Sequence, residues 1–67
     1  FNDAGFARDI SRIGARMVTE KACKKEQVTG FVVAVTDAAW SDSISRSKWF
    51  QEIQDGIDAI LSGKRKM

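Results

Sequence analysis

The sequence predicts an all-α protein, a compact three-helix domain in one soluble chain. Three observations support this fold class. Apolar residues recur with helical periodicity in three segments, and the 67-residue chain contains no Pro or Tyr. It also has too few residues typical of turns and too few β-branched or aromatic residues for a many-stranded β fold. A chain this short can form only one domain, so residues 1–67 are expected to share one core.

The first expected helix covers about Ala4–Cys23. Asn2 or Asp3 supplies an N-cap side chain, and Gly14 indicates either close approach of another helix or a tolerated surface glycine. The apolar residues recur at spacings of four, three and four, which places them on one expected core stripe: Phe6, Ile10, Ile13 and Met17.

The middle segment, about Lys25–Trp40, fits two structures. As a helix it presents one apolar face consisting of Val28, Phe31, Val32, Val35 and Ala39, while Val33 and Trp40 fall on a different side. As α+β, the apolar run Phe31–Val35 forms one central strand, which needs a partner strand from a second copy across a dimer axis. The helix is the preferred interpretation.

The third expected helix has the clearest pattern and begins at Ser45 or Ser47, after a polar connection. Gly63 followed by Lys64, Arg65 and Lys66 is typical of a helix end. Its wide apolar face consists of Trp49, Phe50, Ile53, Ile57, Ile60 and Leu61.

Residue composition argues against an enzyme, a metal site or a cofactor site. The chain has no His and one Cys, which excludes an internal disulfide and the usual zinc ligand sets. The nearby carboxylates Glu52, Asp55 and Asp58 share one side of a helix that we expect to face solvent. Ser45–Lys48 matches the S-x-x-K pattern of serine acyl enzymes, but the chain is too short for their scaffold.

Two further features bear on where the chain acts. The run Phe31–Val35 is far shorter than the roughly 20 apolar residues of a membrane span, and the single Cys23 favours a reducing, intracellular compartment. The first residue is Phe rather than Met, so we expect a processed product or an excised fragment.

Surplus apolar surface predicts an interaction domain that binds a second copy or another protein. If the middle segment is helical, its apolar residues exceed one stripe. Either a partner covers the remainder, or Val33 and Trp40 fill the core because this helix is central. Trp is enriched in binding hot spots. The expected interface residues are therefore Val33, Trp40 and Trp49.

Basic residues predict the alternative function, binding of nucleic acid or another polyanion. Arg8, Arg12 and Arg16 recur every four residues and form a row along the first helix. The other basic residues that extend this surface are Lys24, Lys25, Lys64, Arg65 and Lys66. The net charge of only +2 and the interspersed acidic residues make this function the second choice.

Overall fold

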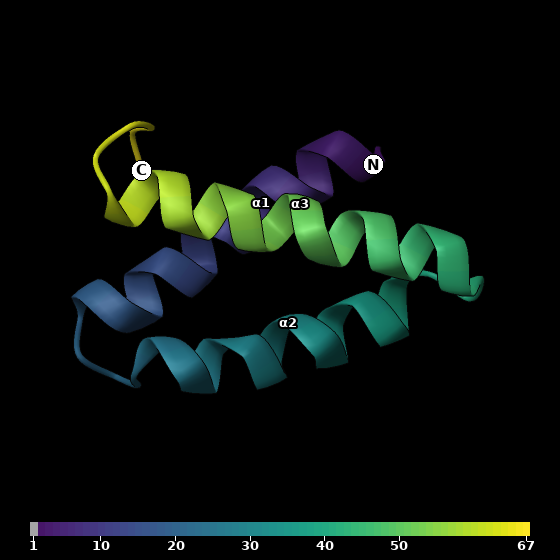
Figure 1. Cartoon of the computed structure of the whole chain (residues 1–67), viewed down its shortest axis with the longest axis horizontal. Coiled ribbons are helices and arrows are strands. Elements are labelled where there is room, and N and C mark those ends of the chain that lie inside the picture. Colours follow the sequence, from purple (N-terminus) through teal and green to yellow (C-terminus); the bar gives the residue numbers. More distant parts are fainter. Residues whose placement is uncertain (1) are drawn as a thin grey trace.

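The structure is a computed structural model that describes residues 2–67. It consists of three helices, α1 (Asp3–Thr19), α2 (Lys25–Ala39) and α3 (Ser43–Leu61). Figure 1 shows α2 alongside α3, with α1 crossing behind α3. The described residues contain no strand, so the all-α prediction is confirmed and the alternative strand at Phe31–Val35 is wrong. This run is helical because Val28, Val32 and Thr36, spaced by four, bury one helical face.

Helix α1 begins where the sequence predicted and ends earlier. The Asn2 side chain caps it by accepting a hydrogen bond from the Gly5 N–H at 2.6 Å. The helix stops at Thr19 rather than Cys23 because Lys21 adopts the left-handed conformation, with φ of 61°. The Lys21 N–H then donates to the Val18 carbonyl and the next N–H to the Met17 carbonyl, which satisfies the last turn of the helix.

Helix α2 begins at Lys25, as predicted, and ends just before Trp40. At its start, the Lys24 N–H donates a 2.8 Å hydrogen bond to the side-chain oxygen of Gln27. At its end, Trp40 is extended, with φ of −127° and ψ of 127°. If α2 continued as a helix, Trp40 would lie on the same side as Val33. The extended backbone turns Trp40 away from that side.

Helix α3 begins at Ser43, before the predicted start at Ser45 or Ser47. The reason is Asp42, whose carboxylate accepts a 2.8 Å hydrogen bond from the Ser45 N–H and so caps the helix earlier. The predicted stop at Gly63 is confirmed, since this glycine has a φ of 82°. The N–H groups of Lys64 and Arg65 both donate to the Ala59 carbonyl, which folds the C-terminal arm back.

The core lies where the three helices meet. Helix α3 contributes Ile53, Ile57 and Ile60, all within its predicted apolar face, and α2 contributes Val28 and Val32. Trp49, Phe50 and Leu61 pack half-buried around this centre, as do Phe31 and Val35, whereas Ala39 is exposed.

Helix α1 packs into the core mainly through small residues, together with Ile10 of its predicted stripe. Its buried residues are Ala7, Ile10, Ser11, Gly14 and Ala15. A Cβ atom on Gly14 would lie 2.6 Å from the Ile57 Cδ1 atom, which confirms close approach of another helix at this glycine. Of the expected stripe only Ile10 is fully buried, and Ile13 is 47% exposed. The prediction that Ile13 lies in the core is therefore wrong, because small side chains let α3 dock on a neighbouring face of α1.

Candidate functional site

The three residues of the predicted interface occupy different environments. Trp40 is buried, with 8% of its surface exposed, Trp49 is half-buried, and Val33 is 43% exposed. The Trp40 ring stacks on the Trp49 ring at 5.6 Å between centroids and meets the Phe6 ring edge-on at 5.5 Å. This aromatic cluster joins α1 and α3 to the residue that follows α2, so most of the Trp40 surface is used inside the molecule.

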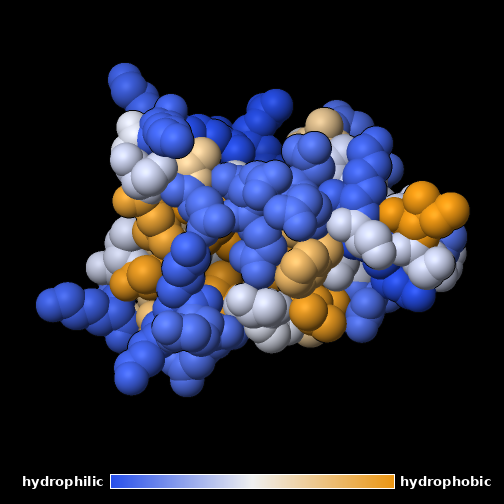
Figure 2. Space-filling view, viewed as in Figure 1, coloured by the Kyte–Doolittle hydropathy of each residue, from blue (hydrophilic) through white to orange (hydrophobic). Residues whose placement is uncertain are grey.

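Val33 lies in a separate, mixed groove between α2 and α3. Its neighbours along the groove include Asp37, Arg46 and Phe50, and the Arg46 Nε lies 3.7 Å from the Asp37 carboxylate. Figure 2 shows that the face formed by α2 and α3 is mainly hydrophilic, with hydrophobic residues in separate patches. Val33 therefore does not form one continuous apolar surface with the two tryptophans.

A strongly apolar groove lies between α1 and α2. It encloses about 580 Å³, and it will be called the α1–α2 groove; its lining consists of Phe6, Ile10, Ile13, Phe31, Val35, Ala38 and Ala39. Beside Ile13, a smaller hollow of about 250 Å³ extends the apolar surface past Met17 to Ala22. The sequence does contain a signal for this groove, because Phe6, Ile10 and Ile13 of the regular α1 stripe all line it.

Charges are sparse along the α1–α2 groove. Helix α2 carries no charged residue between Glu26 and Asp37. Helix α1 carries two ion pairs, Asp9 with Arg12 at 3.6 Å and Arg16 with Glu20 at 3.3 Å, and the second pair lines the smaller hollow beside Ile13. These side chains are about half exposed or more, so each pair stabilises the monomer by only about 0.3–0.5 kcal/mol. These four side chains can therefore form other ion pairs at little cost in free energy.

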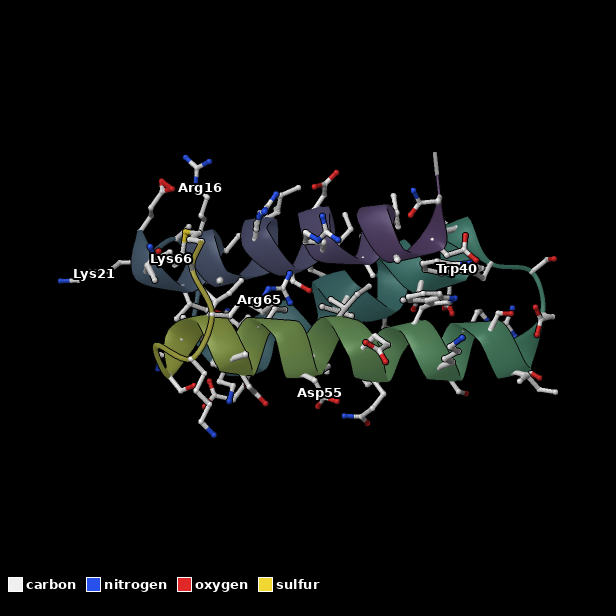
Figure 3. The ribbon with its side chains drawn as sticks, turned by 90° about the horizontal axis from the view of Figure 1, so that it is seen from above. Arg16, Lys21, Trp40, Asp55, Arg65 and Lys66 are labelled. Atoms are coloured by element: carbon white, nitrogen blue, oxygen red, sulfur yellow. The ribbon has the colours of Figure 1, made fainter. Side chains whose placement is uncertain are left out.

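The predicted basic surface is divided by the fold. Arg12 and Arg16 pair with acidic residues of their own helix, and the Lys25 ammonium lies 2.7 Å from the Asp58 carboxylate. Lys24, Lys64 and Lys66 are exposed. Arg65 behaves differently: Figure 3 shows its side chain reaching back between α1 and α3, whereas Arg16 and Lys21 point outward. Arg8 and Arg65 line one pocket there.

Features expected of a metal or catalytic site are few. Within residues 2–67 there is no group of three or more Cys, Asp or Glu side chains placed to hold a metal ion. Glu52, Asp55 and Asp58 are exposed, as predicted, and Cys23 is a half-buried free thiol. Hydrogen bonds from the Ser45 hydroxyl and N–H hold the pKa of the Asp42 carboxyl below its ordinary value, which reflects helix capping. No helix in this part of the chain is long and apolar enough to cross a bilayer.

Comparison with known proteins adds no assignment. The chain matches no protein-family model, and no significantly similar curated protein or solved structure was found.

Proposed function

We propose that this chain is a non-enzymatic interaction domain that self-associates through the α1–α2 groove. The observation that carries the proposal is the pair of apolar stripes that face each other across this open groove, with Ile13, 47% exposed, lining both the groove and the adjoining hollow. A contiguous apolar surface of this kind is typical of a helix-binding site. We place the contact here rather than at Val33, Trp40 and Trp49 because Trp40 is already buried within the monomer.

The charges of α1 favour a second copy as the occupant. Asp9 lies four residues before Ile13 and Arg16 lies three residues after it. If two α1 helices pack antiparallel about a two-fold axis at Ile13, Asp9 of each copy falls within one residue of Arg16 of the other. The two Arg16 side chains are then kept about 9 Å apart along the helix axis, since each residue adds about 1.5 Å.

The α2 surface is compatible with the same arrangement. With no charged residue between Glu26 and Asp37, two copies of this helix meet across the axis without bringing like charges together. The small size of the chain also favours association, because a 67-residue domain buries a limited fraction of its apolar surface by itself.

Sedimentation at a series of concentrations tests the proposal. The wild type is expected to convert from monomer to dimer as concentration rises, and Ile13→Glu should weaken the dimer at least about tenfold by placing an unpaired charge in the groove. Ile44→Glu is the matched control, because Ile44 is 81% exposed and does not line the groove. A wild type that remains monomeric up to about 1 mM would contradict self-association.

Exchange of charges tests the orientation of the two copies. Asp9→Arg and Arg16→Asp should each weaken the dimer, and the double variant should restore it, because the intermolecular pairs are then re-formed with reversed signs. A dimer that none of these three variants alters would contradict the antiparallel contact about Ile13 while leaving dimerisation itself intact. Circular dichroism of every variant shows whether the monomer remains folded.

A further inference from the structure

A further hollow, of about 140 Å³, lies between α1 and α3 on a side of α1 that does not contribute to the α1–α2 groove. It will be called the α1–α3 pocket, and its polar lining consists of Arg8, Ser11, Glu52 and Arg65, with Trp49 as the large apolar wall. Ser11 is committed to the protein, since its hydroxyl donates to the Ala7 carbonyl at 2.8 Å. The groups left to meet a ligand are two guanidinium groups and one carboxylate.

The C-terminal arm places Arg65 in this pocket. After the left-handed turn at Gly63, the Arg65 N–H donates a 3.1 Å hydrogen bond to the Ala59 carbonyl, which fixes the backbone of the arm against the end of α3. The side chain then runs back along α3 to Gly56, where its Nη1 atom lies 2.8 Å from the position that a Cβ would occupy. The absence of a side chain at Gly56 therefore provides the space for the half-buried Arg65.

The charges of the α1–α3 pocket do not balance. Arg8 and Arg65 contribute two positive charges and Glu52 contributes one negative charge. Neither arginine takes part in the ion pairs or side-chain hydrogen bonds found among residues 2–67. Arg8 is exposed and Arg65 is half-buried, and an oxyanion that accepts from both would neutralise the excess positive charge of this hollow.

We propose that the α1–α3 pocket binds a phosphate group, as inorganic phosphate or as a phosphate monoester, with Arg8 and Arg65 as its ligands. Guanidinium groups match phosphate oxygens because each presents several N–H donors in one plane. The Trp49 ring already contacts the Trp40 ring and lies 4.9 Å from the Lys48 ammonium, so we assign it to the pocket wall rather than to stacking with a nucleobase. The ligand group is therefore compact.

The test is a titration of the isotope-labelled protein, followed by nuclear magnetic resonance, at low ionic strength in a buffer without phosphate. Inorganic phosphate and phosphoserine are the two probes, and sodium chloride at matched ionic strength is the reference. We expect saturable shifts at Arg8, Glu52 and Arg65. Tighter binding of phosphoserine would identify a monoester as the ligand, and equal or tighter binding of inorganic phosphate would identify the free ion.

Matched variants connect the binding to these side chains. Arg65→Gln and Arg8→Gln should each weaken binding about tenfold, the usual effect of losing a charge-assisted hydrogen bond. Lys66→Gln, which removes the same charge from an exposed neighbour, should change affinity less than about twofold. Glu52→Gln should strengthen binding severalfold, because it removes the one acidic group of the pocket.

Three results would overturn the proposal. The first is a set of shifts that phosphate and sodium chloride produce equally. The second is equal weakening by Arg65→Gln and Lys66→Gln, which would indicate a diffuse effect of the basic arm. The third is binding of single-stranded DNA without binding of either small probe, which would assign the basic residues to a nucleic-acid surface instead.

Discussion

Gly14 of α1 lies directly against Ile57 of α3, and a methyl group added to this glycine would come within 2.6 Å of the Ile57 Cδ1 atom. The two helices reach this separation because Gly14 lacks a side chain. The Val28 side chain closes the same site from α2, at 3.2 Å from the added methyl group. All three helices therefore meet at Gly14.

Gly14→Ala should lower the free energy of unfolding by about 1–2 kcal/mol, because overpacking outweighs the gain in helix propensity. Gly30→Ala is the control, since nothing lies within 4 Å of a Cβ on Gly30. That change should raise stability by about 0.5–1 kcal/mol. Urea unfolding of monomeric protein measures both, and an equal effect of the two changes would contradict the close contact at Gly14.

Backbone conformation at Lys21 predicts a stabilising substitution. Lys21 has a φ of 61°, a conformation that costs a residue with a Cβ about 1 kcal/mol relative to Gly. Lys21→Gly should therefore be about 1 kcal/mol more stable than Lys21→Ala, which removes the same charge but keeps the Cβ. At Gly63, with a φ of 82°, the change to Ala should instead destabilise the protein. Equal melting temperatures of Lys21→Gly and Lys21→Ala would argue against this conformation.

Asp42 predicts one component of the pH dependence of stability. Hydrogen bonds from Ser45 lower its pKa in the folded protein below the ordinary value near 3.8. The stabilisation by the ionised carboxylate is therefore complete above that ordinary value, and it is lost as the pH falls through the lower folded-state pKa. Asp42→Asn still caps the helix but cannot ionise, so its stability should fall less between neutral pH and about pH 2. Parallel acid titrations of both proteins in urea measure the difference.

Removal of the Trp40 ring should unfold much of the protein. Trp40→Ala deletes a buried ring that contacts both Phe6 and Trp49, a change that typically costs about 3–5 kcal/mol, comparable with the whole stability of a domain of this size. Trp40→Phe keeps an aromatic ring and should remain folded. Circular dichroism during thermal unfolding distinguishes the two variants. If Trp40→Ala instead remained folded and lost only dimerisation, Trp40 would be assigned to the partner interface.

The sequence was sufficient to predict the three helices, because periodicity and capping residues act locally. Its error on α1 has a tertiary cause. Apolar periodicity marked the stripe with Ile13 as the core face. The residues that let α3 approach most closely are small instead, and two of them, Ser11 and Gly14, do not belong to the apolar pattern. Which face of α1 is buried depends on the shape of the neighbouring helix.

The candidate sites were less accessible to sequence reasoning. From the sequence, Trp40 fits either the core or a partner interface, because helical periodicity does not show where the helix ends. The extended backbone at this residue directs it into the molecule. Arg65 appeared as one of several basic residues in a tail, and its place beside α1 depends on the left-handed turn at Gly63 and on the missing side chain at Gly56. These positions result from contacts between residues that are distant in the sequence.

The stacked indoles of Trp40 and Trp49, with 12° between their planes, provide a spectroscopic probe of the contact between the end of α2 and α3. Two chromophores held this closely and nearly parallel couple their electronic transitions, and the coupling vanishes once the end of α2 leaves α3. If α2 detached from α3 but remained helical, circular dichroism would show a loss of the exciton signal of the two indoles with no change in helical content.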